Sequence, residues 1–118
     1  MIGSTRRVRV YAYGAPTDMR RSFDGLFAMV RRDLGRDPLS GDLFLFVGRD
    51  RRRAKVLFWD GTGLCLYAKR LETGLFSAPW KSQLDRPLEM TSSELQLFLE
   101  GSPLAGKVSL SPPEFAIN

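Results

Sequence analysis

The clearest periodic pattern of apolar residues lies near the start of the chain. Apolar residues there recur at steps of 4, 3, 1, 3 and 4, which places them along one side of an α-helix. We expect a helix over about residues 18–34, with Thr17 or Asp18 as its N-cap and Gly35 in the left-handed conformation just after its end. The apolar stripe consists of Met19, Phe23, Leu26, Phe27, Val30 and Leu34.

Three short apolar runs in the middle of the chain predict an antiparallel meander. They cover Leu43–Val47, Ala54–Trp59 and Leu64–Arg70. The dipeptide Asp60-Gly61 between the second and third runs is typical of a hairpin turn. Upstream, arginine and valine alternate within residues 6–13, and this alternation predicts a further amphipathic strand.

The remaining patterns complete a single α+β domain over residues 1–101. Thr91 and Glu94 have the spacing of a capping box, which predicts a short helix at about residues 92–100. We therefore expect an antiparallel sheet of about four or five strands, with the 18–34 helix packed on it. The tail, residues 102–118, contains three prolines and little periodicity, and we expect it to be poorly ordered.

Two of the predicted strands raise the question of what covers the sheet. Leu43–Val47 and Val56–Trp59 are apolar at every position, as in strands that are buried on both faces. The chain offers one good helix and one short helix, so loops or a partner must cover the second face. Aromatic side chains on an open face could also stack on nucleic-acid bases, whereas core packing is the alternative for the same residues.

The basic residues are unevenly distributed along the 118-residue chain, whose net charge is +5. Residues 1–70 carry 15 Lys and Arg against 7 Asp and Glu, whereas residues 71–118 carry 3 against 6. Most of the basic residues are arginines, whose planar five-donor guanidinium suits phosphate oxygens. The pattern is compatible with a nucleic-acid interface and with a solvated basic surface.

Positive charge is densest at the predicted tip of the first hairpin. A basic loop between strands can follow a phosphate backbone or enter a groove of DNA. The alternative is a solvated loop whose charge discourages aggregation of the strands. The candidate DNA contacts are Arg49, Arg51, Arg52, Arg53, Lys55, Lys69 and Arg70.

The chain lacks the usual residues of a catalytic centre. It contains no histidine, which excludes the common general base and the Ser-His and Cys-His nucleophile pairs. Cys65 is the single cysteine and lies in a predicted strand, where we expect a buried, inert thiol. Aspartates at caps and turns do not predict a metal cluster. We therefore expect no enzyme activity, no metal and no cofactor. No apolar run could span a membrane, and we expect a cytoplasmic protein.

Four blocks of the sequence occur in an order and spacing that resemble a known family. The family comprises the transposition accessory proteins called TnpB, which the second open reading frame of insertion-sequence-66-type mobile elements encodes. The resemblance covers about residues 6–101. In this chain the blocks are Asp18–Leu26, Ser40–Phe46, Lys55–Gly61 and Lys69–Phe76. Members of the family usually continue after the last helix with a tryptophan-bearing segment, which this chain lacks.

The resemblance implies a small bacterial protein that assists a separate transposase, and it supplies no established catalytic residues to assign to this chain. We expect it to bind element ends or donor DNA through its arginines. The rival hypothesis is an adaptor that docks on the transposase through an uncovered sheet face. The expected partners are DNA, the transposase, the other accessory protein of the element and a second copy of the chain. The candidate partner contacts are Asp18, Arg20, Arg21, Phe44, Phe46 and Trp59.

Overall fold

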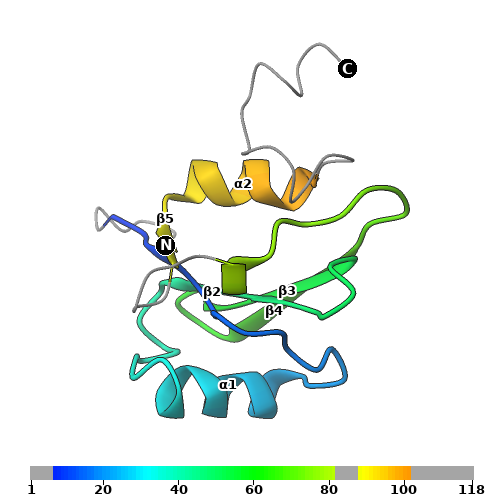
Figure 1. Cartoon of the computed structure of the whole chain (residues 1–118). Coiled ribbons are helices and arrows are strands. Elements are labelled where there is room, and N and C mark those ends of the chain that lie inside the picture. Colours follow the sequence, from blue (N-terminus) through cyan, green and yellow to red (C-terminus); the bar gives the residue numbers. More distant parts are fainter. Residues whose placement is uncertain (1–6, 82–87, 102–118) are drawn as a thin grey trace.

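Two helices lie on opposite faces of a five-stranded sheet (Figure 1). This computed structural model describes residues 7–81 and 88–101, so the predicted 102–118 tail lies outside the described residues. The α+β class is confirmed. The helices are α1 (Phe23–Arg32) and α2 (Ser92–Glu100), with a short 3₁₀ helix at Pro79–Lys81. The strands are β1 (Val10–Ala12), β2 (Leu43–Val47), β3 (Arg53–Trp59), β4 (Leu64–Arg70) and β5 (Leu88–Met90).

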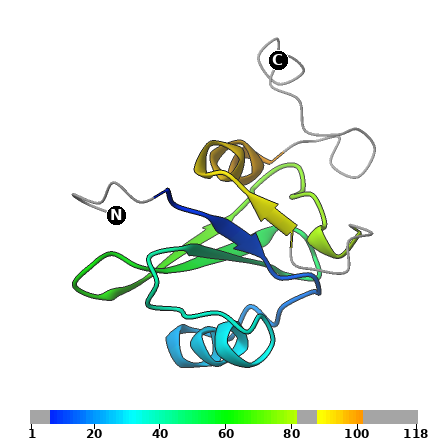
Figure 2. The ribbon, with the colours of Figure 1, turned by 90° about the vertical axis from the view of Figure 1, so that its left-hand side faces the viewer.

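The sheet is mixed, with the strand order β4-β3-β2-β1-β5. The β2-β3-β4 meander is antiparallel as predicted, and β5 is antiparallel to β1. However, β1 runs parallel to β2, with Val10 opposite Leu43, so the prediction of a wholly antiparallel sheet is wrong at this pair. The reason is that α1 connects the two strands by crossing one face of the sheet, which returns the chain in the same direction (Figure 2).

The main helix is shorter than its apolar stripe predicts. It begins at Phe23 with Ser22 as its N-cap, so the prediction of a helix from residue 18 capped by Thr17 or Asp18 is wrong. The backbone N–H of Thr17 instead donates a hydrogen bond to the Val47 carbonyl at 2.9 Å. This bond keeps the chain extended beside β2 and delays the helix by one turn.

The other element boundaries follow the sequence patterns more closely. The Thr91–Glu94 capping box is present, and both of its reciprocal bonds form at the start of α2. Gly35 follows α1 with a φ of 62°, as its predicted left-handed conformation requires. The predicted strand over residues 6–13 shortens to the three residues of β1.

The face of the sheet toward α1 buries the larger aromatic side chains. Phe44 and Phe46 of β2 both have side chains that are 0% exposed, and Tyr11 of β1 lies beside them. Because alternate residues of a strand point to one face, both phenylalanines pack under α1 against Leu26 and Val30. The prediction that Phe44 and Phe46 contact a partner is therefore wrong, because neither side chain reaches the surface.

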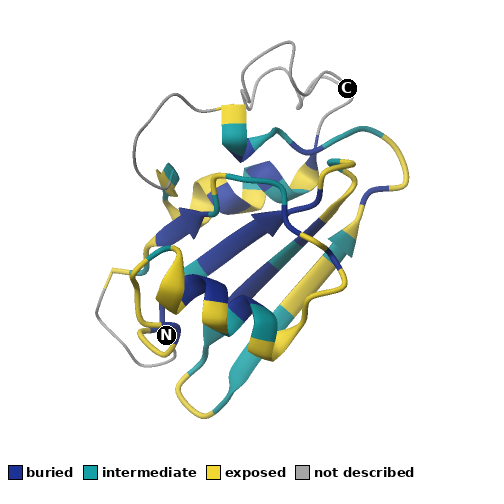
Figure 3. Cartoon of the chain, turned by 60° about the horizontal axis from the view of Figure 1, so that its bottom comes forward, coloured by how far each residue is buried: buried dark blue, intermediate teal, exposed yellow. Residues whose placement is uncertain are grey.

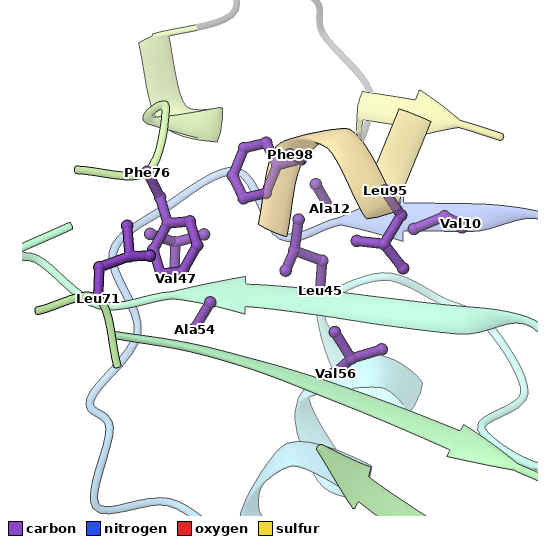
Figure 4. Packing of buried hydrophobic residues seen from close by; sticks show 10 residues of the cluster. All are labelled: Val10, Ala12, Leu45, Val47, Ala54, Val56, Leu71, Phe76, Leu95 and Phe98. Atoms are coloured by element: carbon purple, nitrogen blue, oxygen red, sulfur yellow. The ribbon is translucent and has the colours of Figure 1, made fainter. Parts of the chain in front are cut away.

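The opposite face is covered by α2 together with the segment that follows β4 (Figure 4). Phe98 of α2 stacks on Phe76, with 5.7 Å between the ring centroids and 4° between the ring planes. Both rings belong to the core cluster over Leu45 and Val47 of β2. Of the two expected kinds of cover, loops or a partner, the central strands have a loop, which shares the cover with a short helix. The uncovered face that the adaptor hypothesis supposes is therefore not found over these strands.

The fourth strand is the least covered part of the sheet. It lies at one edge of the sheet and contains no buried residue (Figure 3), and its Tyr67 is 46% exposed. Cys65 on the same strand is half-buried, rather than buried as predicted. Partial burial, and then the nearby Asp60 carboxylate, raise the pKa of its thiol, so the neutral and less reactive form is favoured. The side chain of Trp59, at the end of β3, is also half-buried.

Candidate nucleic-acid interface

Two arginines meet at one end of the β3-β4 ladder. Arg53 lies directly opposite Arg70, so both side chains point to the face of the sheet that carries α1. An open hollow of about 390 Å³ lies between this end of the ladder and the chain before α1. We call it the basic groove. It is lined by Met19, Arg53, Ala54, Lys55, Ala68, Lys69, Arg70 and Glu72.

Carboxylates balance part of the charge of the basic groove. Like charges directly opposite on neighbouring strands repel each other. A carboxylate oxygen of Asp50 lies 3.2 Å from a guanidinium nitrogen of Arg53, and one of Glu72 lies 3.1 Å from Nε of Arg70. The two arginine side chains nevertheless remain 51% and 71% exposed. Their guanidinium groups are therefore accessible to an external anion.

The loop between β2 and β3 is folded by one of these carboxylates. The Asp50 carboxylate accepts the backbone N–H of Arg52 at 3.0 Å as well as the Arg53 side chain. These bonds lower the pKa of Asp50, with the Arg52 N–H the larger cause, so the side chain is ionised at neutral pH. Arg49 and Arg52 are exposed at the rim of the loop, and within residues 7–81 and 88–101 no ion pair engages them.

Lys55 ties the turn before α1 to the sheet. Its Nζ donates hydrogen bonds to the carbonyls of Met19 at 2.8 Å and Arg21 at 2.6 Å. This anchor places the 18–21 turn at the border of the basic groove. Within the turn, Arg20 pairs with Asp18 at 2.7 Å and holds the pKa of that carboxyl well below its usual range. The predicted partner contacts of this turn therefore lie beside the predicted DNA contacts.

Arg51 is turned toward the protein and away from solvent. Its Nε donates to the Phe76 carbonyl at 2.9 Å, and the Phe76 N–H donates to the Arg51 carbonyl at 2.7 Å. Its φ of 60° is uncommon for a residue with a side chain, and the reciprocal bonds hold it there. Arg51 thus fixes the segment that presents Phe76 to the core.

Lys69 has a similar structural role on the other face of the sheet. Its Nζ donates to the Leu99 carbonyl at 2.7 Å, near the C-terminus of α2. A positive charge at this position also interacts favourably with the helix dipole. Lys69 therefore holds α2 against β4.

The seven predicted DNA contacts fall into two groups. Four of them expose their side chains on or beside the basic groove, and three donate to backbone carbonyls that hold the fold together. A sequence pattern cannot separate these groups, because a cation that binds a carbonyl of a distant residue has no local signature. The exposed group is Arg49, Arg52, Arg53 and Arg70, and the structural group is Arg51, Lys55 and Lys69.

Two kinds of feature are absent from the described part of the chain: a cluster of metal ligands and a membrane-spanning helix. Across residues 7–81 and 88–101, no three side chains of His, Cys, Asp or Glu gather in a way that could hold a metal ion. Neither α1 nor α2 has the length and apolarity that crossing a bilayer requires.

Comparison with known proteins identifies the family. Residues 8–108 match the model of the IS66 Orf2 like protein family. The chain belongs to this family. Its members are accessory proteins of insertion sequences. Two relatives from Sinorhizobium fredii (strain NBRC 101917 / NGR234), the uncharacterized proteins y4jC and y4hO, are each 38% identical over 101 residues. The alignments cover 86% of this chain and 85% and 86% of the relatives. No solved structure is significantly similar.

Family membership confirms the resemblance seen in the sequence and extends it to residue 108. The matched region includes the whole β2-β3-β4 meander and the turn before α1, so the basic groove is built from family sequence.

The division into structural and exposed cations predicts different stability effects for adjacent arginines. We expect Arg51→Ala to lower the free energy of unfolding by about 1–3 kcal/mol, because the Phe76 carbonyl loses a charge-assisted hydrogen bond. Arg52→Ala removes the same charge from an exposed side chain and should change the free energy of unfolding by less than about 0.5 kcal/mol. Urea denaturation of both variants measures the difference. Equal effects would contradict the structural role of Arg51.

Proposed function

We propose that the protein is a non-enzymatic accessory factor that binds the DNA of its insertion sequence through the basic groove. The observation that carries the proposal is the cross-strand pair of Arg53 and Arg70, two exposed guanidinium groups on one face. Arg49 and Arg52 add two further exposed cations on the adjoining loop. Four exposed cations on adjoining segments form a positive patch that suits an extended polyanion such as a nucleic-acid backbone.

The ion pairs in the groove do not oppose this proposal. The Arg53–Asp50 and Arg70–Glu72 pairs are exposed, and such pairs contribute little to stability. A phosphate group can accept two parallel, charge-assisted hydrogen bonds from an arginine in their place.

The proposed contacts favour backbone binding over recognition of base sequence. Contacts to phosphate position a protein on DNA, whereas base edges must be reached inside a groove. The exposed arginines lie on strand ends and a short loop, and none of the four belongs to α1, the helix that covers the same face of the sheet. We therefore expect modest sequence preference and a strong dependence of affinity on salt.

A matched pair of double variants tests the proposal on a labelled duplex of an element end. Arg53→Ala/Arg70→Ala removes two charges from the groove, whereas Arg31→Ala/Arg32→Ala removes two charges from the exposed last turn of α1. We expect the groove variant to lose about 10- to 100-fold in affinity and the helix variant to lose less than about threefold. The slope of log affinity against log salt should become shallower by about 2 for the groove variant.

Two results would overturn the proposal. Equal losses from both double variants would mean that affinity follows net charge and not the groove. An absence of DNA binding by the unchanged chain at low salt would remove the DNA role, and docking on the transposase would then be the better account. Circular dichroism of each variant checks that the fold is retained.

A further inference from the structure

The outer edge of β4 has no partner strand in the part of the chain that the structure describes. β4 is the terminal strand of the sheet and is seven residues long. The opposite terminal strand, β5, has three residues and carries Glu89 at its centre. Short edges with an inserted charge resist pairing with other chains, whereas long apolar edges invite it. The β5 edge is therefore protected against pairing with another chain, whereas the β4 edge is not.

The hydrogen-bonding groups on the outer edge of β4 can be assigned from the ladder with β3. Paired residues in an antiparallel ladder alternate between hydrogen-bonded and non-hydrogen-bonded pairs. Leu71 N–H donates to the Arg52 carbonyl and Asp60 N–H to the Gly63 carbonyl, which sets the phase of that alternation. The residues that direct backbone N–H and C=O groups outward are then Leu64, Leu66, Ala68 and Arg70.

The side chains of β4 do little to block this edge. From Leu64 to Ala68 the strand has no charge and no proline, and Tyr67 is 46% exposed. The two charges that follow are engaged within the chain, Lys69 by the Leu99 carbonyl and Arg70 by Glu72. β4 thus has an apolar half followed by a basic half. A partner strand with the opposite order keeps the basic residues of the two strands apart.

We propose that β4 pairs antiparallel with the β4 strand of a second copy of the chain. One register pairs all seven residues: Tyr67 meets Tyr67 of the other copy on the two-fold axis, and Leu64 meets Arg70. In this register no cation faces a cation, because Arg70 lies opposite Leu64 and Lys69 lies opposite Cys65. Parallel pairing in register would place Lys69 and Arg70 beside the same residues of the other copy, and such pairing of like charges is unfavourable.

The proposed dimer has a defined geometry. Antiparallel pairing of two edges requires a two-fold axis perpendicular to the sheet, so both copies turn the α1 face to the same side. The two basic grooves then open on one surface. Because Arg70 lies three residues from the axis, the two Arg70 residues are separated by roughly 20 Å along the strands. The proposed pairing does not depend on DNA binding.

Analytical ultracentrifugation of the full chain tests the pairing. We expect a reversible monomer–dimer equilibrium. Ala68→Pro removes an outward N–H and leaves the β3-β4 ladder bonds in place, so it should weaken the dimer by about thirtyfold or more. Ala68→Ser keeps the N–H and should change the dissociation constant by less than about threefold. A chain that stays monomeric up to several hundred micromolar protein would overturn the proposal.

A cross-linking experiment tests the register and does not depend on a proline variant that folds. In a Cys65→Ala background, Tyr67→Cys places two thiols opposite each other on the two-fold axis, where a disulfide can close. Ala68→Cys in the same background places each thiol opposite Leu66, so it should cross-link at least tenfold more slowly. Equal rates, or faster cross-linking at position 68, would exclude this register. A dimer that Ala68→Pro leaves intact would place the interface elsewhere.

Discussion

Phe46→Ala is expected to lower the free energy of unfolding by about 3–5 kcal/mol, the range for truncating a buried aromatic residue. Phe46 is fully buried at the centre of the sheet, beneath α1. Its removal leaves a cavity between the helix and β2, which the neighbouring strand cannot fill without breaking its ladder. Chemical denaturation monitored by tryptophan fluorescence measures the change.

Phe23→Ala is the matched control for this variant. Phe23 is the first residue of α1 and is 43% exposed, so the same truncation there should change the free energy of unfolding by less than about 1 kcal/mol. If Phe23→Ala were as destabilising as Phe46→Ala, the burial difference between the two rings would not determine stability.

Gly101→Ala should be the second strongly destabilising substitution, by about 2–4 kcal/mol. Gly101 has φ 71° and ψ −178°, a conformation that essentially only glycine adopts. A Cβ there would also lie 2.6 Å from Cδ1 of Leu71, which is part of the core under α2. Backbone strain and overpacking therefore act together. Thermal denaturation followed by circular dichroism measures the loss.

Two further variants separate the causes of that loss. Gly63→Ala adds a methyl group where no atom lies within 4 Å and φ is not positive, so it should be nearly neutral. Leu71→Ala removes the clashing side chain. In the Leu71→Ala background, Gly101→Ala should cost less than it does in the unchanged chain, because only the backbone strain remains. Purely additive effects would show that the Leu71 contact is unimportant.

The sequence was sufficient for the elements that local patterns determine. The meander β2-β3-β4 and the Thr91 capping box were predicted near their observed positions, because alternation, turn residues and caps act over a few residues. The parallel pairing of β1 and β2 was missed, since strand direction is set by the path of the connecting helix. The late start of α1 was missed because the Thr17 N–H bonds a carbonyl thirty residues away.

The density of arginines predicted a basic tip at about residues 49–53, and the structure shows which of these side chains are exposed. Arg53 lines the basic groove together with Arg70 of the neighbouring strand. The sequence did not reveal that Arg51 and Lys55 use their charges to bind backbone carbonyls. It also separated the 18–21 turn from the predicted DNA contacts, whereas Lys55 brings the two together. Each of these contacts links segments that are distant in the chain.

The pairing of β1 with β5 has a consequence for synthesis of the protein on the ribosome. Val10 near the start of the described chain lies opposite Met90 near its end, and α2, which follows β5, covers one face of the sheet. The first eighty residues to emerge therefore carry a sheet whose second face has the loop with Phe76 as cover but lacks α2, and whose β1 edge is unpaired. During translation Leu45 lacks the cover of α2 until residue 101 has left the exit tunnel.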